Sequence, residues 1–371
     1  MNKRTNLWEK TVNFLIKSMV PITLALLIFA GGEKGAENLL KLSLYIINPE
    51  KIFELTVDEI PQEIIKDNKE ESVMTNTVNS NALTEIVKSE IPEDIKVLIE
   101  KAEKDYMNSS NDGKIIPLDY SQQNATSKYN EIYIRNTTLN QNVDIEEYLN
   151  KKVQINITKN KPAVLIYHTH TTETYELLER EFYTNSRSTR SGDSKENMVR
   201  IGEEICKVLE ENGYKTIHDK TVYDETVSGA YDRSRENISK ILKENPSIQV
   251  ALDVHRDSIY QKDGSRIKTV TEINGRNAAQ IMIISGCEDG NVTDFPNWKK
   301  NLTFALRLQE KLAYDNKNLM RPLMFCSRKY NMDLIPCALS IEIGTDANTI
   351  TEAVYSAQLF ANSLSKFLEE Y

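Results

Sequence analysis

The stretch Val164-Leu-Ile-Tyr167-His168-Thr-His170-Thr-Thr-Glu173 is an apolar run that breaks into two histidines and a carboxylate. The run has the length of one buried β-strand, and the chain holds only four histidines, two of them here. Side chains at positions i and i+2 of an extended segment point to the same face, so we expect His168 and His170 to emerge together at the carboxyl end of the strand. Open α/β sheets bind their ligands at that edge.

Two further apolar runs end in residues of the same kind. Residues 248–257 finish in Asp253-Val-His255-Arg-Asp, and residues 337–345 finish in Glu342-Ile-Gly-Thr. Buried strands tolerate charge only where it is paired or used, so three such strand ends predict one site on one edge of a sheet. Two imidazoles and a carboxylate leave one position of a zinc ion for the water that becomes the nucleophile. The pattern therefore predicts a metal hydrolase.

The second half of the chain alternates strand-like and helix-like patterns. Strands are predicted over residues 131–135, 164–167, 214–218, 248–257, 280–285 and 337–345, and helices over 144–149, 194–212, 230–244, 301–315 and 347–369. This alternation predicts an α/β fold in which a largely parallel sheet of about six strands has helices on both faces. We expect this catalytic domain to occupy residues 131–371.

The amino-terminal part has the pattern of a membrane anchor. Residues 12–32 are mostly apolar and long enough to cross a bilayer, with basic residues concentrated in the tail 1–11. The positive-inside rule places that tail in the cytoplasm and the rest of the chain outside it. A cleaved signal peptide is the alternative, because small residues end the apolar stretch. Residues 33–130 are predicted as a juxtamembrane helix and a flexible tether, with a further helix over 92–107.

Composition limits the classes of function. The net charge of −9 argues against nucleic-acid binding, which needs a basic surface. The four cysteines are scattered without the spacing of a disulfide framework, so we expect free thiols.

Four motifs in order resemble the stage II sporulation protein P family of endospore-forming bacteria. They are residues 164–173, Tyr231-Asp-Arg-Ser-Arg235, Leu252-Asp-Val-His-Arg-Asp257 and Ile341-Glu-Ile-Gly-Thr345. The resemblance covers about residues 130–371. The family is similar to zinc-dependent N-acetylmuramoyl-L-alanine amidases, so the resemblance implies an amidase-like fold and Zn²⁺ as cofactor.

The resemblance also implies a biological setting. It implies hydrolysis of peptidoglycan during engulfment, at the amide between muramic acid and L-alanine and also at the stem-peptide crosslink. It implies stage II sporulation proteins D and M as partners. It places the enzyme in the cell membrane as a single-pass protein, with the catalytic domain on the forespore or mother-cell side of the septum.

The zinc ligands follow from the resemblance in part. His170 and His255 fall on the two zinc histidines of the amidases, while His168 is left to orient a ligand, to contact substrate or to serve the fold. The third ligand is open between Glu173, which lies within the histidine motif, and Glu196, which lies at the start of the following predicted helix. Mn or Fe would suit the same ligands as Zn²⁺.

The resemblance implies Glu342 as the general base that takes a proton from water. An ion pair between Glu342 and Arg256 is the structural alternative. Asp253 and Asp257 flank His255 in sequence, so each is a further candidate for a metal ligand or for the carboxylate that sets the histidine tautomer.

Arginines are the candidates for substrate binding. Arg233, Arg235 and Arg256 are predicted to bind carboxylates of the stem peptide, because a guanidinium matches a carboxylate with two hydrogen bonds. Ordinary ion pairs are the alternative for each. His218 ends a strand of its own and is expected to have a structural or supporting role.

Other classes of protein share parts of the pattern. Metal-dependent amidohydrolases on (β/α)₈ barrels also carry His-x-His, but about 240 residues leave little room for eight units. Metallo-β-lactamases need more histidines. A catalytically silent scaffold that binds the cell wall or assembles a membrane complex is the alternative from another class, and metal content and turnover distinguish it from an enzyme.

Overall fold

The computed structural model of the protein describes residues 91–158 and 160–371. The predicted tail 1–11, the transmembrane segment 12–32 and the predicted tether up to residue 90 lie outside the described residues. Among the helices of the described part, none is long and apolar enough to cross a membrane.

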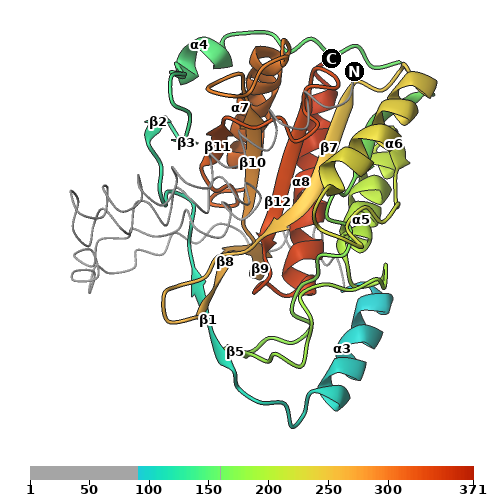
Figure 1. The fold of residues 1–371 in the computed structure, drawn as a ribbon, viewed down its shortest axis with the longest axis vertical. Coiled ribbons are helices and arrows are strands. Elements are labelled where there is room, and N and C mark those ends of the chain that lie inside the picture. Colours follow the sequence, from blue (N-terminus) through green and yellow to red (C-terminus); the bar gives the residue numbers. More distant parts are fainter. Residues whose placement is uncertain (1–90, 159) are drawn as a thin grey trace, which may run out of the picture. The chain divides into compact units, whose positions relative to one another are not determined.

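The described residues alternate helices and strands (Figure 1). The helices are α3 (Glu93–Asp105), α4 (Ile145–Leu149), α5 (Met198–Glu211), α6 (Ala230–Glu244), α7 (Trp298–Asp315) and α8 (Ile350–Leu368). The strands are β1 (Gly113–Leu118), β2 (Ser127–Tyr129), β3 (Ile132–Asn136), β4 (Pro162–Tyr167), β5 (Phe182–Tyr183), β6 (Lys215–His218), β7 (Val250–Asp257), β8 (Arg266–Ile273), β9 (Arg276–Ala279), β10 (Ile281–Gly286), β11 (Leu323–Cys326) and β12 (Ala338–Thr345).

The central sheet has eight strands within the described part, in the order β2-β3-β11-β10-β12-β7-β4-β6. Its neighbouring strands are parallel except for β2 with β3 and β10 with β12, which are antiparallel. The α/β class is therefore confirmed, but the sheet is mixed, and the prediction of a largely parallel sheet of about six strands is wrong. Buried strands of either direction are continuous apolar runs, so the sequence did not reveal that β10 is reversed.

The path of the chain reverses direction at β4, whose neighbour on one side is β6 and on the other side β7. From β4 the chain passes through α5 to β6 at the sheet edge, and then returns through α6 to β7 on the other side of β4. Crossovers between parallel strands are right-handed, so this reversal places α5 and α6 on opposite faces of the sheet. Ligand sites of open α/β sheets lie at such a reversal.

Three helices cover one face of the sheet. α5 and α7 both pack against α8, whereas α6 lies in front of the sheet in the view of Figure 1. The strands between these layers are almost wholly buried; every residue of β7 and of β12 is buried. Polar side chains on these two strands therefore sit in the interior of the domain.

The folded region begins well before residue 131. Helix α3 lies within the predicted range 92–107, buries Ile95 and Ala102, and is ion-paired from Asp94 to Arg200 of α5 at 2.6 Å. Strand β1 pairs with β5 and with β8 in a second, four-stranded sheet. The described part of the predicted tether is thus part of the domain, because its short apolar stretches pair with strands far along the chain.

Local signals fixed several boundaries. Asp144 caps α4, its carboxylate accepting a hydrogen bond from the backbone N–H of Glu147 at 3.0 Å. Helix α6 spans the predicted residues. Helix α5 begins at Met198, four residues later than predicted, because Asn197 rather than Ser194 is the cap.

All four cysteines are buried free thiols, as expected.

Candidate active site

The chain turns sharply after β4. The strand ends at Tyr167, and the backbone N–H of Glu173 donates to the carbonyl of His170 at 3.2 Å across the turn. The expectation that His168 and His170 emerge together is wrong, because the i, i+2 rule holds only while the chain stays extended. The two histidines belong to different environments.

His168 is a structural residue. It is fully buried, its Nδ1 lies 2.8 Å from the carbonyl oxygen of Val254, and its Nε2 lies 2.9 Å from Nε2 of His218. Burial lowers the pKa of His168 to about 4 and that of His218 to about 2, with further lowering of the latter by His168. Both imidazoles are therefore neutral and hold β4, β6 and β7 together.

His170 faces the other way, toward α6 and β7. Its ring lies edge-on to the rings of Tyr231 and His255, at centroid distances of 5.7 and 5.4 Å. Burial lowers the pKa of His170, and its buried Nδ1 has no hydrogen-bond partner within the described chain. A neutral imidazole is the form of histidine that a metal ligand requires.

His255 and Glu342 are brought together by strand register. β7 and β12 are parallel neighbours, and His255 is paired with Glu342 across them. Side chains directly opposite each other on neighbouring strands point to the same face. Both residues lie inside their strands near the carboxyl ends, within the predicted ranges 248–257 and 337–345.

Asp253 precedes His255 by two positions and shares its face. Its carboxylate accepts hydrogen bonds from the backbone N–H of Thr169 at 2.8 Å and from the Thr169 hydroxyl at 2.6 Å. Its Oδ1 also lies 2.7 Å from Nε2 of His255, but the two groups are not oriented for a hydrogen bond. Asp253 therefore ties the turn after β4 to the imidazole of β7.

Glu173 approaches the other nitrogen of His255. Its Oε2 lies 3.6 Å from Nδ1 of His255. Burial raises the pKa of Glu173, but Arg256, His255 and His170 outweigh this and hold it well below its usual range. Burial lowers the pKa of His255, while Asp253, Glu173 and Glu342 together raise it well above normal. Glu173 is thus an anion that faces a strongly basic imidazole.

Glu342 has the opposite electrostatics. Burial, with smaller contributions from Asp257 and Glu173, raises its pKa to about 8, although His255 and Arg321 act to lower it. Its Oε2 is buried and has no hydrogen-bond partner within the described residues. A carboxyl group poised near neutral pH beside two histidines fits a general acid or base.

The donor chemistry of this cluster fits a zinc ion. His170, His255 and Glu173 supply two imidazoles and a carboxylate, which is a ligand set of hydrolytic zinc sites. As they stand, no three His, Cys, Asp or Glu side chains of residues 91–158 and 160–371 are grouped closely enough to hold a metal ion. The orphaned Nδ1 of His170 and Oε2 of Glu342 are nonetheless groups that a cation or water would satisfy.

Other predicted ligands lie elsewhere. Glu196 is ion-paired with Arg187 at 3.2 Å, and no contact joins it to either histidine in the described chain. Asp257 accepts a hydrogen bond from Arg321 at 2.7 Å and is likewise engaged away from the histidines. The structure therefore brings Glu173, and not Glu196 or Asp257, to the candidate ligands.

The predicted substrate-binding arginines have structural partners. Arg256 is buried and donates to the carbonyls of Thr174 and Thr189, each at 2.9 Å, so it braces the loop that carries Glu173 rather than pairing with Glu342. Arg233 is exposed and donates to carbonyls of the segment 223–228, and Arg235 forms two hydrogen bonds with Asp333. The sequence showed guanidinium groups near the motifs but not their acceptors.

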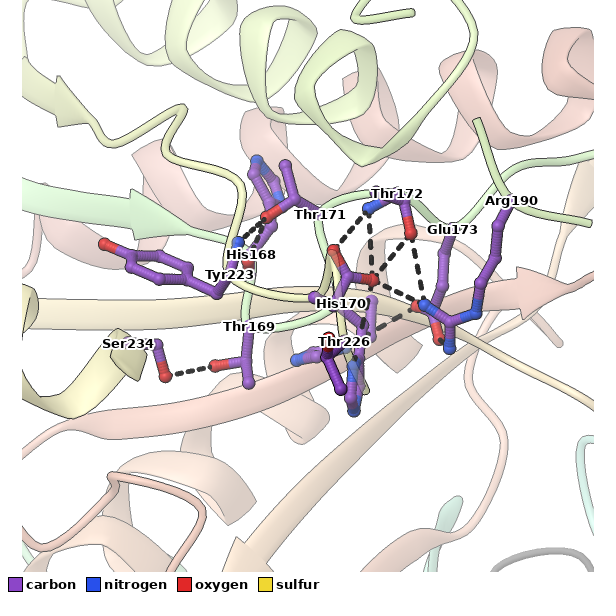
Figure 2. Close-up of polar contacts among 12 residues, drawn as sticks. His168, Thr169, His170, Thr171, Thr172, Glu173, Arg190, Tyr223, Thr226 and Ser234 are labelled. Carbon is purple, nitrogen blue, oxygen red and sulfur yellow. Dashed lines mark hydrogen bonds and ion pairs between the residues drawn. The ribbon is translucent and has the colours of Figure 1, made fainter. Parts of the chain in front are cut away.

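Arg190, Asp224 and Tyr231 lie at the site and were missed as site residues. Arg190 contacts Thr172 and Glu173 (Figure 2), and Tyr231 contacts His170. Of the three, Tyr231 alone lies within one of the quoted motifs, so it alone could have been named from the sequence. Arg190 and Asp224 come from loops outside the quoted motifs, so no local pattern marked them.

The sequence model of stage II sporulation protein P matches residues 64–365 of this chain. The chain belongs to the stage II sporulation protein P family. The resemblance seen in four motifs is thus confirmed, and the family match begins N-terminal to them, in agreement with the early start of the folded region. A curated member of the stage II sporulation protein P family, from Bacillus subtilis (strain 168), is 28% identical over 222 residues, or 56% of this chain. The chain covers 52% of that relative's length.

Solved amidase structures are also similar to the chain. The N-acetylmuramoyl-L-alanine amidase AmiC2 of Nostoc punctiforme has a TM-score of 0.33 and 11% identity, over 57% of this chain and 99% of that one. The CwlD amidase from Clostridioides difficile, solved in complex with the GerS lipoprotein, has a TM-score of 0.35 and 14% identity, over 56% of this chain and 100% of that one. The family assignment itself comes from the sequence match.

Proposed function

We propose that this member of the stage II sporulation protein P family is a peptidoglycan hydrolase, a zinc-dependent N-acetylmuramoyl-L-alanine amidase. The observation that carries the proposal is the register of β7 and β12, which sets Glu342 beside His255. His170 and Glu173 from the turn after β4 add a second imidazole and a second carboxylate next to His255, at the carboxyl ends of parallel strands, where α/β sheets bind ligands. A purely structural role would not require an unpartnered carboxyl oxygen in the interior.

The site residues would have two kinds of role: three would bind the metal ion, and one would transfer a proton. His170, His255 and Glu173 would hold the zinc ion, which when bound polarises the scissile carbonyl and activates water. Glu342 takes the proton of the attacking water and returns it to the leaving amine. Asp253 fixes the orientation of the His255 ring, and Tyr231 limits the rotation of the His170 ring.

The wider setting is part of the proposal. Anchoring by residues 12–32 would place the domain outside the cytoplasm at the cell membrane, where peptidoglycan is accessible. Action during engulfment, cleavage of the stem-peptide crosslink, and cooperation with stage II sporulation proteins D and M are proposed because the family resemblance implies them.

The test is release of free stem peptides from purified peptidoglycan by the full-length protein. We expect release with zinc, none with a chelator, and recovery when zinc is restored. Glu342→Gln keeps the size of the side chain but cannot accept a proton, so we expect at least about a 100-fold loss of rate. Glu196→Gln, which alters a carboxylate outside the cluster, should retain activity.

The opposite result has a definite meaning. If folded wild-type protein binds peptidoglycan but releases no peptides with zinc, either alone or with stage II sporulation proteins D and M added, the amidase proposal fails. The chain would then be a wall-binding scaffold. Activity that is unchanged in Glu342→Gln would instead remove Glu342 from its assigned role.

A further inference from the structure

The loop that follows the histidine motif folds back against it. The backbone N–H of Ser191 donates to the carbonyl of Thr172 at 2.7 Å, and that of Thr174 donates to the carbonyl of Thr189 at 3.0 Å. These bonds form a short antiparallel ladder in which Arg190 lies directly opposite Glu173. Residues directly opposite in such a ladder have neighbouring side chains. The backbone therefore places one arginine beside a candidate metal ligand.

Arg190 is held there by a buried carboxylate. Its Nη1 lies 2.5 Å from Oδ2 of Asp224, whose side chain is fully buried, and 3.2 Å from the Thr172 hydroxyl. Asp224 also accepts hydrogen bonds from the backbone N–H and the hydroxyl of Thr172. A charge-assisted bond to a fully buried acceptor is a strong contact, so the guanidinium has a defined position although its side chain is 35% exposed.

The pair reaches two candidate ligands at once. Nη2 of Arg190 lies 3.7 Å from Oε1 of Glu173, and Oδ2 of Asp224 lies 4.0 Å from the unpartnered Nδ1 of His170. A nearby carboxylate favours the tautomer with its proton on Nδ1, which leaves the lone pair on Nε2. The guanidinium also offsets the repulsion between the carboxylates of Asp224 and Glu173.

We propose that Arg190 and Asp224 form one positioning pair, in which Asp224 sets the tautomer and orientation of His170 and Arg190 fixes the carboxylate of Glu173. The role rests on the proposed zinc site. Neither residue touches the reacting atoms; both act through the ligands.

Zinc affinity of the full-length protein tests the pair independently of activity. We would measure it by competition with a chromophoric chelator in wild type, Arg190→Ala, Arg190→Lys and Asp224→Asn. Residues that support metal ligands typically contribute about 10- to 100-fold to affinity, and we expect that loss in Arg190→Ala and in Asp224→Asn. Lys, a point charge without the planar fork, should restore affinity only in part.

Arg235→Ala is the matched control. Arg235 is 41% exposed and pairs with Asp333, a buried acid, but it does not contact Glu173 or Asp224. Its zinc affinity should equal that of wild type. Because the two residues act as one unit, the double variant of Arg190→Ala and Asp224→Asn should lose no more affinity than the worse single variant.

Co²⁺ provides a second readout, because its visible absorption reports the ligand field. The band positions should shift in Arg190→Ala and stay unchanged in Arg235→Ala. If Arg190→Ala binds zinc within about twofold of wild type and its Co²⁺ spectrum is unchanged, the positioning role of the pair is refuted. The proposed zinc site would then still stand. Wild type that binds no zinc would overturn both. Circular dichroism and thermal unfolding in chelator separate loss of fold from loss of ligand positioning.

Discussion

His168 and His218 share one hydrogen bond through their Nε2 atoms, 2.9 Å apart, and neither imidazole carries a charge. The carbonyl of Val254 can only accept, so Nδ1 of His168 bears the proton and its Nε2 accepts from Nε2–H of His218. Protonation of His168 would put its new Nε2–H against the Nε2–H of His218, whereas protonation of His218 keeps the hydrogen bond but places a charge in a buried contact. Burial therefore disfavours a charge on either ring.

This contact predicts how stability falls in acid. Both histidines have folded pKa values below the unfolded value of about 6.5, so the unfolded chain takes up protons that the folded chain does not. Their contribution is complete above pH 6.5 and is lost as pH falls, down to about pH 4 for His168 and about pH 2 for His218. Each neutral histidine adds a slope of about 1.4 kcal/mol per pH unit to the free energy of unfolding. In His218→Gln, whose amide can still donate to His168, we expect one such slope to vanish.

Urea unfolding at several pH values from 7 to 4.5 measures that difference, because other titrating groups contribute equally to both proteins. Equal slopes in wild type and in His218→Gln would mean that His218 is charged in the folded state.

Gly202 predicts a steric limit at the same contact. A Cβ atom there would lie 2.4 Å from Nε2 of His218 and 2.5 Å from Nε2 of His168. Gly202→Ala gains about 1 kcal/mol of helix propensity but must displace two packed rings, so we expect net destabilisation of about 1–3 kcal/mol. Gly192→Ala, with nothing within 4 Å of the new Cβ, is the control and should change the unfolding free energy by less than about 0.5 kcal/mol.

The third zinc ligand can be assigned by a pair of glutamine variants. Glu173→Gln removes the charge that faces His255, and we expect a loss of zinc binding of at least about 10-fold. Glu196→Gln changes a residue ion-paired with Arg187 and should bind zinc as wild type does. Isothermal titration calorimetry of the two variants gives the answer, and the reverse pattern would move the ligand to the start of α5.

Asp253 predicts a separable effect on catalysis. Asp253→Asn keeps the shape of the side chain but weakens its hold on the His255 ring and its contacts with Thr169. We expect peptide release to slow by about 10- to 100-fold. Peptide release and zinc content are measured on the same preparation. A variant as active as wild type would show that the His255 tautomer is set by another group.

The sequence predicted the helices and six of the twelve described strands, and it named most of the cluster but not every neighbour. Apolar runs located β4, β7 and β12, and the motifs named His170, His255, Glu173 and Glu342, which the structure brings together at the carboxyl ends of these strands. Local patterns report local chemistry, so they revealed the polar strand ends.

The sequence did not predict features that depend on contacts between residues far apart in the chain. The reversed direction of β10 depends on its partners, and β1 is a strand because β5 and β8 lie on either side of it. The division between His168 and His170 arises from a turn that extended geometry does not describe. Arg190 meets Glu173 through a loop ladder, and Arg256 finds backbone carbonyls, so neither role could be read from residue type.

The register of β7 and β12 makes strand length itself part of the proposed catalytic machinery. Side chains alternate between the two faces of a sheet, so loss of one residue of β12 upstream of Glu342 would turn the glutamate from the α6 side toward α8. The sheet can tolerate single substitutions near His255 and Glu342, but one insertion or deletion would shift the register of the strand. In evolutionary terms, the spacing between Ala338 and Glu342 is a harder constraint than the identity of the side chains between them.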